Sequence, residues 1–165
     1  MELLIVSDSH GHAERLVEAL HRQIRRPDAI CFLGDGLADT EVWASVGIPV
    51  YTVRGNCDWS GFYRDEPTER FLYLEGHQLM LTHGHVYDVK SGYERLIAVA
   101  REKGADIVLF GHTHMPAELS VSPQNGERRM YLFNPGSIAY DEGEGYSFGT
   151  LTLKGETVLF SHGRI

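Results

Sequence analysis

Apolar positions in the first third of the chain follow two different spacings. Residues 1–7 form an apolar run typical of a strand buried on both faces, and 29–33 and 49–53 have the same character. Apolar residues recur at helical spacing over 12–26, and a short helix is predicted over 39–46, capped by the carboxylate of its first residue. The inward face predicted for the longer helix consists of Leu16, Val17, Leu20 and Ile24. This β-α-β-α-β order predicts parallel strands joined by right-handed crossovers.

The rest of the chain is predicted to be mostly strands. Segments 69–74 and 78–81 form a hairpin around the turn 75–77, and the amphipathic segment 91–103 forms a helix that ends at Gly104. The other predicted strands are 105–110, 117–121, 129–133, 148–153 and 157–160, with turns at 123–126 and 154–156. The order of elements predicts an α/β (α+β) fold, in which two mixed β-sheets pack as a sandwich with helices on both outer faces.

The length of 165 residues, 42% of them hydrophobic, predicts a single domain, 1–165, with a full core. The chain has no run of 18 apolar residues that would span a membrane, and its N-terminus lacks the basic start and cleavage site of a signal peptide. Cys31 and Cys57 form no CxxC pair, so we expect free thiols and a cytoplasmic location. The net charge of −8 argues against general binding of nucleic acid or anionic membranes.

Seven side chains that can ligate metals follow five successive strand-like runs, each group beside a glycine. They are Asp8, His10, Asp35, Asn56, His83, His112 and His114. Because ligands of α/β folds bind beyond the carboxyl ends of parallel strands, we expect these side chains to meet at one edge. Each pair two residues apart would point to the same side of an extended backbone.

The mixture of carboxylate, amide and imidazole groups indicates transition-metal ions. Four imidazoles argue against a site for calcium or magnesium alone, and no thiolate is needed, which argues against structural zinc. Seven ligands exceed the needs of one ion, so we expect two ions about 3.5–4 Å apart that share a carboxylate. Each motif alone could have a role unrelated to metal, such as Asp8 capping a helix. The predicted metal site would be absent only if every motif had such a role at once.

The ordered motifs D-x-H, G-D, G-N, H and G-H-x-H resemble those of the calcineurin-like metallophosphoesterase superfamily, most closely its small single-domain prokaryotic phosphodiesterase branch. The match runs from Asp8 to His114, and the NPGS motif at 134–137, expected to form a tight turn, also resembles this branch, so about the whole chain is covered. The resemblance implies a β-sandwich flanked by helices. It assigns Asp8, His10 and His114 to a first metal and Asn56, His83 and His112 to a second, with Asp35 bridging.

The resemblance also implies the reaction. Family members hydrolyse phosphoesters by in-line attack of a hydroxide held between two divalent metals, which also neutralise charge on the phosphoryl oxygens. We therefore expect a metal-dependent phosphodiesterase in which Asp35 is catalytic and Asn56 also contacts the substrate. The expected cofactors are two divalent transition-metal ions, with manganese the first choice and nickel, cobalt, iron or zinc as alternatives.

One residue departs from the family pattern. Many members carry a histidine after G-N as a proton donor to the leaving group or a phosphate contact, whereas this chain has Cys57. The small phosphodiesterase branch commonly lacks this histidine too. A thiol, with an ordinary pKa of about 8.5, is a weak substitute, so we expect good leaving groups to be preferred.

Other polar side chains near the motifs have secondary roles. His85, two residues past His83, is the main alternative for a proton donor or substrate contact, and His12 is a lesser one. Asp39 and Asp58 are expected to cap helices or orient ligands rather than bind metal. The histidines expected at the surface are His21, His77 and His162.

Three other functions compete with phosphodiester hydrolysis. A phosphomonoesterase would use the same site, although the missing histidine argues mildly against it. A non-catalytic protein-binding scaffold is suggested by a eukaryotic retromer subunit that resembles this branch, but such proteins tend to lose ligands that this chain keeps. The third is a metal-binding regulator without turnover. The expected partner is a small-molecule phosphodiester, without a stable nucleic-acid complex or a membrane, and relatives imply a homodimer or homotetramer.

Overall fold

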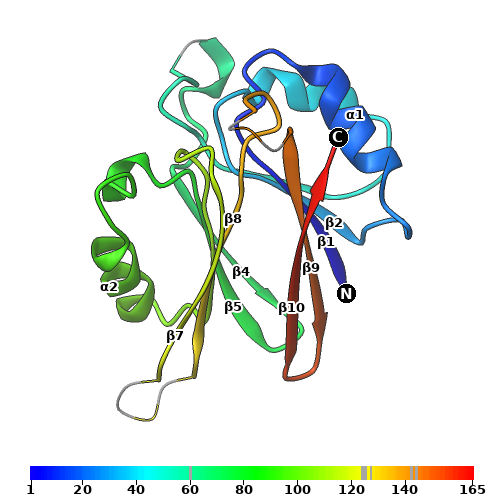
Figure 1. The fold of residues 1–165 in the computed structure, drawn as a ribbon. Coiled ribbons are helices and arrows are strands. Elements are labelled where there is room, and N and C mark those ends of the chain that lie inside the picture. The colour runs from blue at the N-terminus through cyan, green and yellow to red at the C-terminus, as the bar shows by residue number, and fades with distance from the viewer. Residues whose placement is uncertain (60, 124–125, 127, 142, 144) are drawn as a thin grey trace.

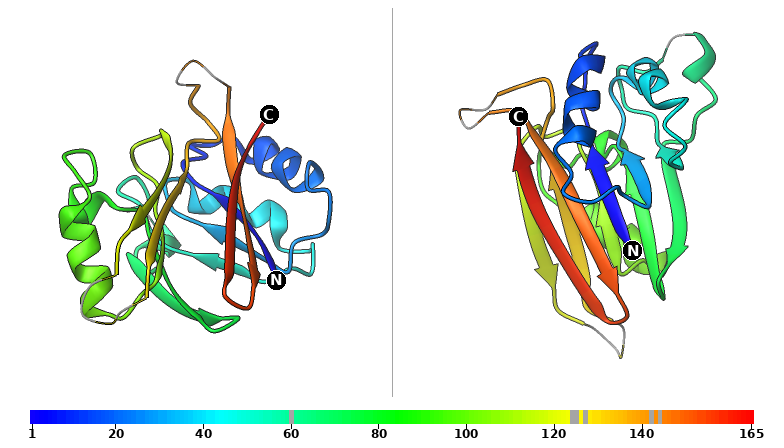
Figure 2. Two further views of the ribbon diagram at one scale, coloured as in Figure 1. Left: turned by 60° about the horizontal axis from the view of Figure 1, so that its bottom comes forward. Right: turned by 90° about the vertical axis from the view of Figure 1, so that its right-hand side faces the viewer.

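Two five-stranded sheets packed face to face make up the protein (Figure 1). The computed structural model describes residues 1–59, 61–123, 126, 128–141, 143 and 145–165. Helices α1 (Ala13–His21) and α2 (Glu94–Glu102) lie on opposite outer faces of the sandwich, as the left view of Figure 2 shows. The predicted sandwich with helices on both faces is therefore confirmed. Within the described part of the chain, the helices are too short or too polar to cross a membrane.

The first sheet contains the three parallel strands predicted for the first third of the chain. Its order is β10-β9-β1-β2-β3, and β1 pairs parallel with β2, as β2 does with β3. The C-terminal hairpin completes it, with β9 antiparallel to β1 and to β10. The strands are β1 (Glu2–Val6), β2 (Ala29–Phe32), β3 (Val50–Thr52), β9 (Ser147–Lys154) and β10 (Thr157–Arg164).

The second sheet has the order β4-β5-β6-β8-β7, with β5, β6 and β8 parallel and the two edge strands antiparallel. Its first hairpin turns at Glu75 and Gly76, whose φ angles of 51° and 85° fit the tight turns that match strand twist. The strands are β4 (Glu69–Leu74), β5 (His77–Thr82), β6 (Ile107–Leu109), β7 (Pro116–Val121) and β8 (Met130–Pro135).

Three hydrophobic layers hold these elements together. Alternate residues of β1 point to opposite faces, so Leu3 belongs to the same buried cluster as Leu109, between the sheets, while Leu4 belongs to the cluster that contains Leu16 of α1. A third cluster joins the second sheet to α2. Because both faces of the central strands are covered, their sequences are apolar throughout, which is the pattern that predicted them.

The helices are shorter than their apolar periodicity predicted. The segment 12–26 forms only α1, and Ile24, expected on the inward face, is fully exposed. The side-chain amide of Gln23 donates to the carbonyl of Ala19 at 2.8 Å, which satisfies the helix end at that point. The predicted helix 91–103 is α2, and Gly104 adopts the expected left-handed conformation with φ of 74°.

The predicted helix 39–46 is a 3₁₀ helix, η1 (Leu37–Trp43), that begins two residues earlier. Asp39 therefore does not cap it, and the prediction was wrong. Its carboxylate instead accepts hydrogen bonds from the Ser9 hydroxyl and the Gly11 amide, in the loop after β1. Two further 3₁₀ turns are η2 (Gly61–Tyr63) and η3 (His85–Tyr87).

The C-terminal strands extend further than expected. Strand β10 continues past residue 160 to Arg164, and Asn134 and Pro135 belong to β8, so the expected NPGS turn begins only at Gly136. Part of the turn predicted at 123–126 lies outside the described residues. His21 is exposed as expected, but His162 is half-buried, stacked on a phenylalanine and bonded to the Asn134 carbonyl.

His77, also expected at the surface, is buried with 4% of its area exposed. Its Nδ1 lies 2.8 Å from the carboxylate of Asp106, and its Nε2 donates to the carbonyl of Gly155 at 3.0 Å. Asp106 precedes β6, and Gly155 lies in the turn of the β9–β10 hairpin, at the bottom of Figure 1. His77 thus fastens the two sheets to each other at this end of the sandwich.

We expect His77→Leu to lower the free energy of unfolding by about 2 kcal/mol, because Asp106 and the Gly155 carbonyl lose buried hydrogen bonds. Urea denaturation followed by circular dichroism measures this, with exposed His21→Leu as the matched control. Equal stability of the two variants would show that the cross-link is dispensable.

Candidate metal centre

Loops at the carboxyl ends of five strands meet at the upper edge of the sandwich in Figure 1. Asp8, Asp35 and Asn56 follow β1, β2 and β3, and His83 and His112 follow β5 and β6. Both sheets therefore contribute to one site, and each parallel strand delivers its candidate ligand in the loop beyond its last residue.

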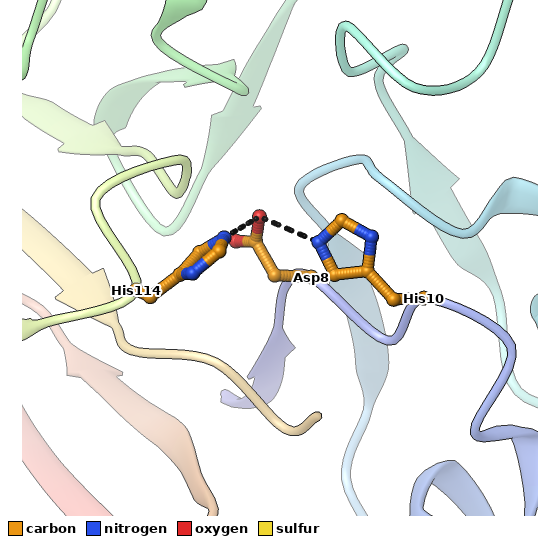
Figure 3. A group of neighbouring side chains, drawn as sticks. All are labelled: Asp8, His10 and His114. Carbon is orange, nitrogen blue, oxygen red and sulfur yellow. Dashed lines mark ion pairs between the residues drawn. The ribbon is translucent and has the colours of Figure 1, made fainter. Parts of the chain in front are cut away.

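Asp8, His10 and His114 form the first group of candidate ligands (Figure 3). Nε2 of His114 lies 3.2 Å from Asp8 Oδ1, and Nε2 of His10 lies 3.8 Å from the same oxygen. Figure 3 shows the two rings approaching this oxygen from opposite sides. These are the three residues that the family resemblance assigns to a first metal, an assignment that stays a prediction.

Asp35, His83 and His112 form the second group. Nε2 of His83 lies 3.4 Å from Asp35 Oδ2, 3.2 Å from His112 Nδ1 and 3.2 Å from Asn56 Oδ1. On its other side, His83 Nδ1 donates to the carbonyl of Leu33 at 2.7 Å. This bond fixes the ring so that, when neutral, it presents the Nε2 lone pair to the other three groups.

The two groups adjoin through Asp35. Its Oδ2 lies 3.9 Å from His10 Nε2 of the first group, and Asp8 Oδ1 lies 3.9 Å from His83 Nε2 of the second. Asp35 also forms a third close group with His10 and the sulfur of Cys57. The Asp35 carboxylate thus lies within 4 Å of residues of both groups, and its role as a ligand shared between two ions stays a prediction.

The backbone is strained where these ligands stand. Among the described residues, seven non-glycine residues have a positive φ, and five of them are candidate ligands: Asp8, His10, Asp35, His112 and His114. The expected geometry was wrong in this respect, because neither pair two residues apart lies on an extended segment. Sharp left-handed turns direct the side chains, a cost of about 1–3 kcal/mol per residue that structures retain mostly at functional sites.

The site has the properties that metal ions require. Asp8 Oδ1 and His10 Nε2 are buried polar atoms without a hydrogen-bond partner, although each faces other polar side chains. Oxygen and nitrogen lone pairs that converge without a donor between them repel each other unless a cation lies among them. The carboxylate, amide and imidazole groups fit divalent transition metals.

The pKa shifts favour the metal-binding forms of the two carboxylates and of His112, whereas the neighbouring carboxylates favour the protonated forms of His83 and His10. Burial opposes ionisation of both carboxylates, but neighbouring histidines outweigh it, holding the pKa of Asp8 well below its usual range and lowering that of Asp35 to about 2. Burial, aided by His83, lowers the pKa of His112 to about 4. Burial works against protonation of His83 as well, but the Asp35 and Asp8 carboxylates outweigh it and raise its pKa. At neutral pH, Asp8 and Asp35 are ionised and His112 is neutral.

The two candidate proton donors neighbour different members of the second group: Cys57 lies beside Asp35, and His85 lies near His83 and His112. Cys57 is an exposed residue, but partial removal of its sulfur from water, together with the Asp35 carboxylate, raises the pKa of the thiol to about 11, so it is a weaker acid than an ordinary thiol. The His85 ring centroid lies 5.4 Å from that of His83, and its Nδ1 is buried without a partner. His12 turns away and bonds to Glu14 at 3.0 Å.

Asp58 holds the loops that carry Asp35 and Asn56. Its buried carboxylate accepts hydrogen bonds from four backbone amides, those of Asp35, Gly36, Leu37 and Gly55. The loops touch so closely that a Cβ at Gly55 would lie 2.1 Å from Asp35 Oδ1, so only glycine fits there. The predicted supporting role of Asp58 thus takes the form of a clamp on two ligand loops.

The NPGS motif supports the ligand loops after β6 and β1 through hydrogen bonds to their backbones. The side-chain amide of Asn134 donates to the Gly111 carbonyl at 2.9 Å, and the Ser137 hydroxyl donates to the Asp8 carbonyl at 3.0 Å. The ring of Tyr140 stacks on His114 with centroids 4.8 Å apart. No motif in the sequence pointed to Tyr140, because the contact joins residues far apart in the chain.

Comparisons with known proteins agree with this geometry. Residues 1–163 match the calcineurin-like phosphoesterase superfamily domain. The chain is 32% identical over 163 residues to the probable metallophosphoesterase YsnB of Bacillus subtilis (strain 168), covering 97% of this chain and 90% of the relative. It is also 32% identical over 167 residues to the phosphodiesterase YfcE of Escherichia coli (strain K12), covering 87% and 82% respectively.

A similar fold occurs in a solved structure. A predicted phosphoesterase from Streptococcus pneumoniae TIGR4 superposes with a TM-score of 0.77 at 26% identity, covering 98% of this chain and 87% of the other. The likeness extends over both sheets and so includes all five loops of the centre.

We expect Asp58→Asn to lower the free energy of unfolding by roughly 2–3 kcal/mol, because an amide cannot accept four backbone hydrogen bonds. Affinity for added Mn²⁺ should fall about 10- to 100-fold as the ligand loops loosen. Denaturation and calorimetry measure the two effects, with exposed Asp65→Asn from the following loop as the control. Unchanged Mn²⁺ affinity would contradict the role of Asp58 as a clamp.

Proposed function

Since the chain belongs to the calcineurin-like phosphoesterase superfamily, we propose that it is a metal-dependent phosphodiesterase acting on small-molecule diesters. The similarity to the phosphodiesterase YfcE supports hydrolysis of diesters in particular. The observation that carries the proposal is the pair of adjoining ligand groups, Asp8–His10–His114 and Asp35–His83–His112, whose atoms lie within 4.8 Å of one another in each group.

The proposed roles follow from position. Asp8, His10 and His114 would hold one ion, and Asn56, His83 and His112 a second, with Asp35 shared between them. When bound, divalent ions activate water as a nucleophile and neutralise charge on a phosphoryl group. Manganese remains our first choice, because the carboxylate and imidazole groups suit it, although nickel, cobalt, iron and zinc accept the same groups.

The protein's own side chains then position the ester. The Asn56 amide and the His85 ring stand beside the second group, where polar atoms of a phosphate can reach them. His85 Nδ1 is buried without a partner, so a phosphoryl or leaving-group oxygen would satisfy it. Burial lowers the pKa of His85, with His83 adding to the effect, which favours its neutral form.

The competing functions differ in what they demand of this site. A phosphomonoesterase gains from a strong proton donor after Asn56, where this chain has a thiol with a pKa of about 11. A non-catalytic scaffold has no need to keep strained, buried ligands, yet five of the seven carry a positive φ. The strain therefore favours catalysis.

Removing metal with a chelator should abolish turnover of bis(p-nitrophenyl) phosphate, and adding Mn²⁺ should restore it. Asp35→Asn should lower the restored kcat/KM by more than about 100-fold, because a shared ligand is lost. Loss of a residue that only supports a ligand costs at most about 100-fold, so a larger decrease indicates a ligand. Circular dichroism checks the fold, and exposed Asp88→Asn, also at a positive φ, is the control. Turnover that survived both chelation and Asp35→Asn would rule out the two-metal centre.

Aryl phosphodiesters should be hydrolysed with a kcat at least about 10²–10⁴ times that of alkyl diesters, because Cys57 gives little general-acid help to a poor leaving group. The comparison uses ethyl p-nitrophenyl phosphate and diethyl phosphate. Cys57→His, which restores the residue common in the family, should narrow the difference. Equal kcat values for the two esters, with chemistry rate-limiting, would refute this account.

A further inference from the structure

A cleft of about 420 Å³ lies beside the candidate metal centre, on the side of Cys57. Its walls come from the loops that carry the ligands, including Gly11 after His10 and Gly36 after Asp35. Cys57 lines the cleft, and its sulfur belongs to the close group with His10 and Asp35. A substituent on a phosphate held at the centre would therefore reach directly into this cleft.

The two carboxylates in the cleft are already engaged within the protein. Asp58 accepts four backbone hydrogen bonds, and Asp39 accepts those of the Ser9 hydroxyl and the Gly11 amide. No lysine or arginine is among the described residues that line the cleft. The cleft therefore disfavours an anionic group, because it offers negative charge and no cation to oppose it.

Aromatic side chains form the outer wall. Phe62 in η2 is 99% exposed, and Tyr63 beside it is fixed by a hydrogen bond from its hydroxyl to Glu41 at 2.8 Å. Trp59, one residue after Asp58, does not line the cleft but is also 73% exposed. The 3₁₀ turn η2 rises above the upper edge of the sandwich in Figure 1. Large aromatic rings left in water beside a cleft mark a surface that gains free energy when an apolar ligand covers it.

We infer that this cleft binds one ester substituent of the substrate, and that the substituent is a flat, uncharged aromatic group stacked on Phe62. An aryl ring and a nucleobase both have this chemistry. Stacking of a base on an aromatic side chain strengthens binding by about fivefold to more than 100-fold, and we expect roughly tenfold here, near the lower end of this range. The inference rests on the proposed function, since it takes the phosphate to lie at the metal centre.

Calorimetry on the Mn²⁺-loaded protein tests the inference without turnover. Two ligand pairs isolate the aromatic group: phenylphosphonate against methylphosphonate, and adenosine 5′-monophosphate against ribose 5-phosphate. The wild type should bind the aromatic member about tenfold more tightly in at least one pair. In Phe62→Ala the ratio of the two dissociation constants within a pair should fall to nearly one. The stability of the protein should change little, because the Phe62 side chain is exposed. Leu159→Ala, an exposed apolar residue of β10, should keep the wild-type ratio.

The pair that loses its preference identifies the substituent. A loss confined to the phosphonates indicates a short aryl group, a loss confined to the nucleotide pair indicates a base, and either result supports the cleft. Equal ratios in the wild type and Phe62→Ala overturn the inference, as does failure of all four ligands to bind. A protein that binds with these ratios but hydrolyses no phosphoester would refute the proposed function and leave the cleft established.

Discussion

Two buried carboxylates, those of Asp8 and Asp35, set the constraint on which the rest of the centre depends. Both are ionised, and both are largely removed from water, so positive charge must be supplied nearby. Histidines from three separate loops, those after β1, β5 and β6, supply part of it, yet Asp8 Oδ1 still lacks a hydrogen bond. The fold thus holds the lone pairs of carboxylate, amide and imidazole groups close together, an arrangement that a divalent cation stabilises. The ligand loops are shaped to bring these groups to one place.

Holding these side chains in place costs conformational free energy, because the backbone at the ligands adopts unfavourable left-handed conformations. Left-handed turns at five ligands point the side chains inward, and polar residues behind the loops keep these turns from relaxing. Asp58 clamps the loops after β2 and β3 through four amides, while Asn134 and Ser137 brace the loops of the histidine pair and of Asp8. These three supporting side chains are buried and hydrogen-bonded, which suits a site whose protein ligands are held in place before metal ions bind.

The two ends of the sandwich have different tasks. At the far end, His77 joins the sheets through Asp106 and Gly155, away from any candidate ligand. At the near end, the strands stop and their loops carry strained ligands, a thiol of raised pKa and the exposed aromatic side chain of Phe62. Stability is thus concentrated in the strands and at the far end, which lets the near end carry unfavourable features used for chemistry and recognition.

The sequence by itself predicted the two mixed sheets, the helices on both faces and the seven residues that meet at one edge, because these depend on local apolar periodicity and on which residues follow each strand. It misjudged Ile24, Asp39, His77 and His162, whose surroundings are made by segments distant in the chain. Only the tertiary structure decided that left-handed turns direct the ligands, that NPGS braces them and that Phe62 stands exposed beside the centre. These features arise from contacts between loops, and periodicity within one strand or helix carries no information about which loops will touch.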